Sequence, residues 1–398
     1  MACISVKFLS QKVNKVRWQP GDLQGLQPSH TFVTGSWDND ENRICLWRLP
    51  TAKEKGDRIS SGVAGYLSPA SDGDVDGDGI NREPQLVCQE KHEGDVTDLK
   101  FVNSDIFLAS SSAGSIQAFK LMQGAQKLHS AQRWEGLHGL RTRACPCTSV
   151  AVSGTDITTV GEDGRINVLR LEQRHPIRTI DQADSSTINA VTYLKSNQVV
   201  TVNSTGQMKI WDLRQPGSQP TRVFLLTGEK TALHCVDRHP TQSHLVAAGS
   251  QNCVLNMWDM RREKYPVTLF DGHDGPIWEV RFHPTCSDHL FTCSEDGSVL
   301  HWNGSGSPSA SQIAAGAQNA RAGDSIYPSL GLGGMPSKPS SSPLASPWLA
   351  SDSSNQVDIN HVLPSNIMPV NSVDIEGDQL VCGTDGEAVF VIKSLGLR

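Results

Sequence analysis

The chain has 398 residues, a formal net charge of −7 and 37% hydrophobic residues. No dense run of Lys and Arg is present, which argues against nucleic acid as a direct ligand, because phosphate binding needs a concentrated cationic surface. No stretch approaches the ~20 apolar residues of a membrane span, and the N-terminal MACISVKFLSQKV lacks the apolar region of a signal peptide, so we expect neither membrane insertion nor secretion.

One spacing recurs along the chain. A tight-turn residue is followed, six positions later, by a large apolar side chain, and this unit repeats about every 40 to 50 residues. The pairs are Ala113 and Phe119, Asp163 and Leu169, Thr205 and Trp211, Asn252 and Trp258, Asp296 and Trp302, and Asp385 and Val391. A turn between two short strands at this period, ending in Trp or Trp-Asp, is typical of WD40 propeller blades. We therefore predict an all-β fold, a single seven-bladed WD40 β-propeller over 1–398.

The blades can be placed in chain order. Each begins with an inner strand of the form V-x-x-V-x-aromatic or a variant of it, such as VNKVRW in blade 1. The predicted boundaries are about 13–89, 92–134, 145–181, 187–226, 231–271, 273–362 and, for blade 7, 370–393 plus 3–8. Only SLGLR follows the third strand of blade 7, so the N-terminal strand ISVKF is expected to complete that blade and close the ring. Closure of this kind removes both exposed sheet edges.

Two segments do not fit the repeat. Residues 51–84 and 303–356 are rich in Gly, Ser and other small or polar residues, and we predict that both are flexible, solvent-exposed insertions. The strand VDINHV, 357–362, would follow the second insertion as the outer strand of blade 6. Ser-Pro pairs at 307–308, 342–343 and 346–347 leave regulation by phosphorylation open, with a mobile linker as the simpler interpretation.

The first insertion contains a match to the calcium-loop pattern D-x-D-x-D-G-x5-E. The matching positions are Asp72, Asp74, Asp76, Gly77 and Glu83. The pattern needs two flanking helices, but SSGVAGYLSPAS precedes it and Pro84 follows it, so a disordered acidic loop is favoured and weak calcium binding at 72–83 stays open.

Cys145-Pro-Cys147 lacks a second Cys/His pair at zinc spacing. The ten dispersed cysteines favour reduced, buried thiols in a reducing compartment. No metal or cofactor is predicted.

Blade 6 contains an apparent Ser/His/Asp set, formed by His273, Ser294 and Asp296, with Trp302 nearby in the sequence. In WD repeats these positions form a hydrogen-bonded structural tetrad inside the blade, so Ser294 is predicted to be an internal donor and not an exposed nucleophile. No G-x-S-x-G elbow, phosphate loop or H-E-x-x-H is present. We therefore predict that the chain is not an enzyme and has no catalytic residues, with a propeller enzyme as the least favoured alternative.

Two consecutive W-D-x-R boxes, Trp211-Asp-Leu-Arg214 and Trp258-Asp-Met-Arg261, suggest an alternative function. They resemble boxes on WD40 substrate receptors of cullin-type ubiquitin ligases, in which the Arg faces the adaptor. The competing interpretation is that Arg214 and Arg261 cap the turn after their own strands.

A protein-binding surface can be predicted from the inner strands. The first two apolar residues of V-x-x-V-x-aromatic are three apart, which requires a bulge that turns the intervening residue toward the upper rim of the ring. The residues at this position are Asn14, Thr97, Thr148, Asn189, His234, Trp278 and Asn371. An aromatic residue in a polar ring is typical of an interface anchor. We hypothesise that Trp278 and His234 anchor a partner segment; the alternative is that Trp278 is buried in blade packing.

Several stretches go beyond the general WD40 pattern: FLSQKVNKVRWQP, TGSWDNDENRICLW, TTVGEDGRINVLR, TIDQADSSTINAVTYL, LHCVDRHP and LFTCSEDGSVLHW. They resemble the family of 43-kDa WD-repeat nucleoporins through all seven blades in order, and the mass of 43.1 kDa agrees. The resemblance implies a non-catalytic scaffold subunit of the Y-shaped outer-ring complex of the nuclear pore, which supports protein and mRNA transport. It also implies a location at the nuclear envelope, kinetochore association in mitosis, and α-solenoid nucleoporins as partners of a monomer within a hetero-oligomer.

Overall fold

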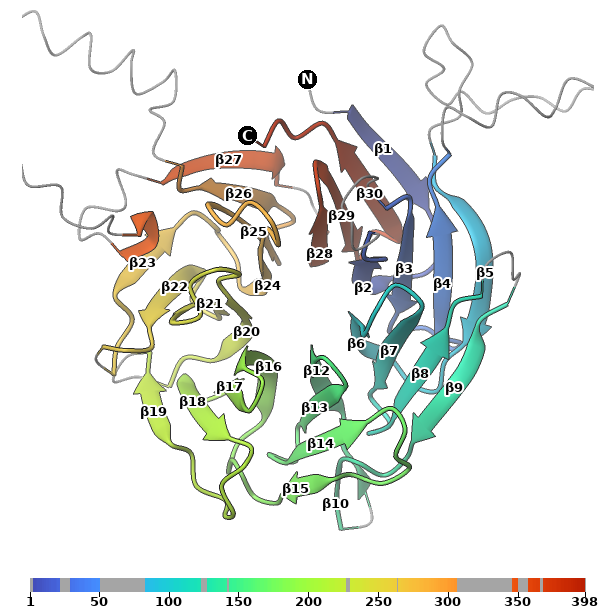
Figure 1. Cartoon of the computed structure of the whole chain (residues 1–398). Helices are drawn as coiled ribbons and strands as arrows, with labels where there is room; N and C mark the ends of the chain where they lie inside the picture. Colours follow the sequence, from blue (N-terminus) through green and yellow to red (C-terminus); the bar gives the residue numbers. More distant parts are fainter. Residues whose placement is uncertain are drawn as a thin grey trace, which may run out of the picture.

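Seven sheets form a ring in this protein. The computed structural model describes residues 3–21, 29–50, 83–122, 127–141, 143–226, 230–262, 264–305, 346–349, 357–365 and 368–397. Within these residues, seven four-stranded antiparallel sheets surround a central axis, as Figure 1 shows. The predicted all-β, seven-bladed propeller is therefore confirmed.

The strands of each blade run from the axis outward in chain order. Blade 1 contains β2 (Val13–Trp18), β3 (Thr31–Ser36), β4 (Arg43–Arg48) and β5 (Gln85–Lys91). Blade 2 contains β6 (Val96–Phe101), β7 (Ile106–Ser111), β8 (Ile116–Lys120) and β9 (His129–Trp134). Blade 3 contains β12 (Cys147–Ser153), β13 (Asp156–Gly161), β14 (Ile166–Arg170) and β15 (Arg178–Ile180), preceded by a hairpin of β10 (Gly139–Leu140) and β11 (Arg143–Ala144).

The remaining blades follow the same plan. Blade 4 contains β16 (Ile188–Lys195), β17 (Gln198–Asn203), β18 (Gln207–Asp212) and β19 (Arg222–Leu225). Blade 5 contains β20 (Leu233–Arg238), β21 (Leu245–Ser250), β22 (Val254–Asp259) and β23 (Thr268–Asp271). Blade 6 contains β24 (Ile277–Phe282), β25 (His289–Ser294), β26 (Val299–Asn303) and β27 (Asp358–Leu363).

Blade 7 closes the ring with strands from both ends of the chain. It contains β28 (Val370–Glu376), β29 (Gln379–Thr384), β30 (Ala388–Lys393) and, on its outer side, β1 (Cys3–Phe8). β1 pairs antiparallel with β30 in unbroken register, from Cys3 opposite Lys393 to Phe8 opposite Ala388. The predicted closure by the N-terminal strand is confirmed.

The core lies between neighbouring blades, where the first apolar residue of each inner strand is buried. Gly35 of β3 leaves room for Val96 of the next blade, because a Cβ at Gly35 would lie 2.3 Å from Val96 Cγ1. Gly249 of β21 admits Ile277 in the same way, at 2.6 Å from its Cγ2. These contacts bring adjacent sheets into close packing and hold the starts of the inner strands at a common level around the axis.

The two predicted insertions fall largely outside the described residues. In the second, residues 303–305 at the end of β26 and residues 346–349 are described. Residues 346–349 include the short 3-10 helix η2 (Pro347–Leu349), and here the expected solvent exposure is wrong. Trp348 is fully buried and its ring lies 6.2 Å from that of Phe270 and 5.8 Å from that of Phe282. One large aromatic side chain thus fixes a short piece of a segment whose average composition is that of a linker.

In the first insertion only residues 83 and 84 are described. The side chain of Glu83 forms a 2.8 Å ion pair with Lys7 of β1. The other positions of the acidic pattern, and the question of calcium there, lie outside the described residues. Among the helical residues that the structure describes, none forms a helix long and apolar enough to cross a bilayer.

Candidate functional site

All seven inner strands carry the predicted bulge. In each, the pairing with the second strand shifts register immediately after the first residue. The residue left out of the pairing is the one expected from V-x-x-V: Asn14, Thr97, Thr148, Asn189, His234, Trp278 and Asn371. All seven line one cavity of about 480 Å³. We call this end of the channel, where the inner strands begin, the upper mouth.

Five of the seven rim residues connect adjacent blades. Each donates a side-chain hydrogen bond to the carbonyl oxygen of the first residue of the next inner strand, and we call these five bonds the clasps. The three amide clasps are Asn14 to Val96 at 2.7 Å, Asn189 to Leu233 at 2.7 Å and Asn371 to Val13 at 3.0 Å. The two hydroxyl clasps are Thr97 to Cys147 and Thr148 to Ile188, the latter at 2.5 Å. These polar residues are thus committed to holding the ring together.

The two remaining rim residues, His234 and Trp278, form no clasp to the next blade among the described residues. Their rings instead contact each other, with centroids 4.7 Å apart and planes inclined by 51°. Both are partly buried, and Trp278 packs with its inner side against the core between blades 6 and 7. His234 Nε2 lies 2.5 Å from Gln251 Oε1, and burial lowers the pKa of His234, which favours the neutral ring. An uncharged aromatic pair therefore occupies the part of the rim where the clasps are missing.

Sequence reasoning missed further residues at the upper mouth. Trp37, Lys15, Glu295, Pro369 and Asp385 also line the cavity. Trp37 belongs to the turn after β3, and its Nε1 donates to Asp385 Oδ1 of blade 7 at 3.0 Å. The sequence SWDND contained a signal for this residue. Its Trp-Asp pair lies in a turn, whereas the Trp-Asp pairs of the repeat lie at the end of a third strand.

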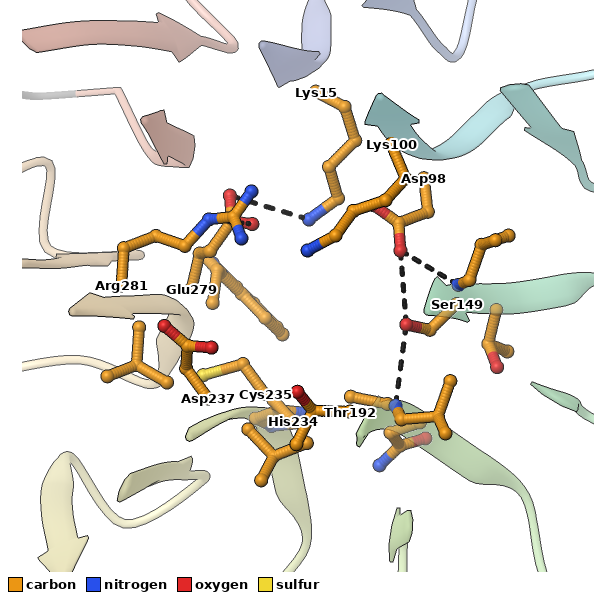
Figure 2. Close-up of a pocket in the computed structure, with 18 of the residues that line it drawn as sticks. Lys15, Asp98, Lys100, Ser149, Thr192, His234, Cys235, Asp237, Glu279 and Arg281 are labelled. Atoms are coloured by element: carbon orange, nitrogen blue, oxygen red, sulfur yellow. Dashed lines mark hydrogen bonds and ion pairs between the residues drawn. The ribbon is translucent and has the colours of Figure 1, made fainter. Parts of the chain in front are cut away.

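Deeper in the channel, Arg17 of β2 lies at the centre of a buried charge cluster. Its guanidinium donates to Glu279 at 2.5 Å and to Asp98 at 3.2 Å, and the exposed fractions of the three side chains are 5%, 8% and 10%. Burial would raise the pKa of Glu279, but the positive charges of Arg17, Lys15 and Arg281 together outweigh it and hold that pKa well below its usual range. Figure 2 shows Glu279 and Asp98 on different sides of the channel, with Lys15 also directed toward Glu279. The cluster therefore connects blades 1, 2 and 6.

The tetrad of blade 6 differs in one member from the prediction. His273 Nδ1 lies 3.0 Å from Asp296 Oδ2, as expected for an internal network. The hydroxyl that joins His273 to Trp302 belongs to Thr292, at 2.6 Å from His273 Nε2 and 2.9 Å from Trp302 Nε1. Burial lowers the pKa of His273, so its neutral ring donates through Nδ1 and accepts from Thr292 through Nε2.

Ser294 is not part of this chain of hydrogen bonds. Its buried hydroxyl donates to the carbonyl of Gly275 at 2.9 Å and accepts from the backbone of Asp296 at 3.2 Å. The reason is register: Trp302 pairs with Leu290, so the residue two positions along the same face, Thr292, is the nearest hydroxyl. The Ser/His/Asp set therefore lacks a Ser–His contact in this structure.

A second network of the same kind, in blade 3, was also missed. His138 Nδ1 lies 2.9 Å from Asp163 Oδ1, and its Nε2 lies 2.9 Å from Thr159 Oγ1. Leu169 stands at the position that Trp302 has in blade 6. The shared signal is T-x-x-x-D, in Thr159-Val-Gly-Glu-Asp163 and Thr292-Cys-Ser-Glu-Asp296.

The arginines of the two W-D-x-R boxes bind their own aspartates. Arg214 donates to both carboxylate oxygens of Asp212, at 3.1 and 2.9 Å, and Arg261 does the same to Asp259, at 2.9 and 2.8 Å. Their side chains are 69% and 61% exposed. The geometry is that of a cap on the turn after the third strand.

The part of the chain that the structure describes contains no group of three or more His, Cys, Asp or Glu residues placed to hold a metal ion. All ten cysteines are free thiols, and Cys145 and Cys147 are buried.

Comparison with known proteins agrees with this architecture. The family described as "WD domain, G-beta repeat" matches residues 219–259 and 264–303. The chain is 43% identical to nucleoporin Nup43 of Mus musculus over 98% of the chain and 99% of that protein, and 42% identical to nucleoporin Nup43 of Homo sapiens over the same shares. It is 27% identical to nuclear pore complex protein nup43 of Dictyostelium discoideum over 60% of the chain and 51% of that protein. The chain belongs to the Nup43 family of WD-repeat nucleoporins.

Proposed function

We propose that the chain is a non-catalytic scaffold subunit of the nuclear pore, within its Y-shaped outer-ring complex. The observation that carries this proposal is the similarity to nucleoporin Nup43 over nearly the full length of both chains. In this role the chain supports transport of protein and mRNA, resides at the nuclear envelope and joins kinetochores in mitosis. The internal use of His273, Asp296 and Ser294 supports a role without catalysis.

Within that role, the upper mouth is the surface that docks an α-solenoid nucleoporin. Support comes from the rim itself: the polar residues are occupied by clasps, whereas His234 and Trp278 form a partly buried aromatic pair that lines a cavity. Aromatic side chains in partly desolvated pockets contribute most of the binding energy in many interfaces. Glu295 at the same mouth supplies a negative charge for orientation.

Affinity purification tests the scaffold role. The tagged chain is expressed in vertebrate cells, and proteins recovered with it are quantified by mass spectrometry. Solenoid nucleoporins in stoichiometric yield, with the tag at the nuclear envelope, support the proposal. Recovery of a cullin-ligase adaptor that is lost when Arg214 and Arg261 are both changed to Glu would support the ligase alternative and contradict the proposal.

The docking surface has its own test. Trp278→Ala should weaken binding of the recovered nucleoporin at least about tenfold in a pull-down titration, because it removes the larger ring of the aromatic pair. The matched control is Tyr265→Ala, which removes another aromatic side chain, 52% exposed and outside the cavity.

The two tests separate the parts of the proposal. If Trp278→Ala keeps the wild-type affinity and thermal transition while solenoid nucleoporins are still recovered, the upper mouth is not the docking surface, although the scaffold role stands. If Tyr265→Ala weakens binding as much as Trp278→Ala does, the anchor assignment is also contradicted.

A further inference from the structure

The opposite end of the channel, where the inner strands finish, collects unpaired positive charge. We call it the lower mouth: a cavity of about 340 Å³ whose lining includes Lys100, Lys195 and Arg238. None of these three forms an ion pair or side-chain hydrogen bond with a residue that the structure describes. By contrast, Lys15, Arg17 and Arg281 at mid-channel all contact Glu279.

Lys100 is the innermost of the three cations, because it lines both the lower-mouth cavity and the mid-channel cavity. Figure 2 shows its side chain extending into the channel, with Arg281 on the opposite wall. The charge of Arg281, then burial and the charge of Arg17, lower the pKa of Lys100 to about 8, although Asp237 and Asp98 act in the other direction. Positive charge at this point is therefore in excess.

The two nearby carboxylates are already engaged. Asp237 accepts the backbone N–H of Arg238 on one oxygen and that of Phe282 on the other, both at 2.9 Å. Asp98 accepts from Arg17 on one oxygen and from the backbone of Val150 on the other. Neither carboxylate forms an ion pair with Lys100, so its ammonium group is left without a directly paired counter-charge among the described residues.

We propose that the lower mouth binds a small soluble polyanion bearing phosphate groups. Lys100 at the inner end and Arg238 and Lys195 at the rim would contact separate charged oxygens, and Arg238 is able to bind two oxygens of one phosphate. The hydroxyl of Thr192, which lines both cavities and has no hydrogen-bond partner among the described residues, is a further donor. An anion beside Lys100 would add an attraction where its ammonium group now has no ion-pair partner among the described residues.

Isothermal titration with inorganic pyrophosphate and with inositol hexakisphosphate tests this site. The full chain is used at constant ionic strength set with NaCl, because salt screens nonspecific attraction. We expect saturable one-to-one binding and an upward shift of the thermal transition. Saturation by pyrophosphate alone identifies an inorganic polyphosphate as the ligand, whereas tighter binding of the hexakisphosphate identifies a phosphorylated organic molecule.

Two variants and a control locate the binding. Lys100→Gln should weaken the tighter probe at least about tenfold, and Arg238→Gln should do the same from the rim. Lys120→Gln removes an exposed lysine on the third strand of blade 2, away from both cavities, and should leave binding unchanged. The proposal is overturned if neither probe saturates by millimolar concentration, or if Lys120→Gln weakens binding as much as Lys100→Gln does. Loss of the fold in Lys100→Gln would not obscure the answer, because Arg238→Gln reports on the same site.

Discussion

The hydroxyl of Thr292 connects two side chains of blade 6 that are far apart in the sequence. Its hydroxyl accepts from the indole of Trp302 on the third strand and donates to the ring of His273, which precedes the first strand. Both partners are buried, so each hydrogen bond satisfies a group that water cannot reach. One hydroxyl therefore keeps the histidine turned toward Asp296 and the blade internally connected.

We expect Thr292→Val to destabilise the protein by roughly 1–3 kcal/mol, because it leaves Trp302 Nε1 and His273 Nε2 buried without partners. Thr292→Ser keeps the hydroxyl and loses one methyl group, so its cost should be about 1 kcal/mol. Urea denaturation of the wild type and the two variants measures the differences in the free energy of unfolding. Equal unfolding free energies for the two variants would show that the hydroxyl is not what stabilises the blade.

Sequence reasoning identified three members of this tetrad and misassigned the fourth. His273, Asp296 and Trp302 follow from the repeat, but the choice between Thr292 and Ser294 depends on which hydroxyl lies beside Trp302 across the strand pair. That choice depends on the register between the second and third strands of the blade, which the spacing of residues along one strand does not determine. The role of Trp37 was missed for a related reason, because its contact with Asp385 joins residues from opposite ends of the chain.

At the scale of elements, β1 is the strand on which ring closure depends. It contributes six consecutive pairs to β30, yet its own side chains are poorly buried and Phe8 is 74% exposed. Its stabilising effect therefore comes mainly from the backbone ladder and from covering an otherwise open edge.

Deletion of residues 1–8 should lower the thermal transition by several degrees and promote self-association, because the edge of β30 becomes available to other chains. Calorimetry and light scattering measure the two effects. A synthetic peptide of residues 1–8 added in excess should reverse both.

The control for the deletion is Lys7→Gln. It removes only the Lys7–Glu83 ion pair, in which both side chains are over one-third exposed, and should change stability little. A deleted protein that unfolds at the wild-type temperature and stays monomeric would contradict the role assigned to β1.

The closing strand could be predicted because blade 7 was short of one strand and ISVKF was unused. The position of η2 could not be predicted from the sequence. Its surroundings are rich in Ser, Gly and Pro, and it is fixed by packing of Trp348 in the core cluster beside Phe270 and by a hydrogen bond from Thr268 to the Trp348 carbonyl. Composition averaged over a long segment conceals a single anchoring residue.

At the scale of the whole molecule, the Arg17 cluster connects blades that are distant in sequence. Glu279 of blade 6 accepts from Arg17 of blade 1 and also from Ser372 of blade 7, at 2.6 Å. The cluster is buried, so its charges stabilise the ring only as a matched set.

Arg17→Met should therefore destabilise the protein by roughly 3–5 kcal/mol, because it leaves Glu279 and Asp98 buried without their main partner. The double variant Arg17→Met, Glu279→Gln removes a charge of each sign and should recover part of the loss. Chemical denaturation of both variants and of Glu279→Gln alone provides the comparison. If the double variant is less stable than the single one by the full cost of Glu279→Gln alone, the two residues are not coupled.

The sequence alone was sufficient for the ring, its closure and the bulge positions, since each depends on local pattern. It did not show that five rim residues act as clasps, because those bonds run between blades. The identity of a partner also lay beyond local pattern, since a propeller of this kind is compatible with many partners. Family membership rests on similarity over the full chain.

The interruption of the clasps at His234 and Trp278 has a consequence for symmetry. A disc of seven similar blades looks nearly alike after each one-seventh turn about its axis, so a partner that contacted only the repeated features would have seven almost equivalent rotational settings. The aromatic pair occurs at one place on the circle and removes that degeneracy. A partner that binds there is held in a single rotational setting, which also determines the direction in which every other blade projects into an assembly.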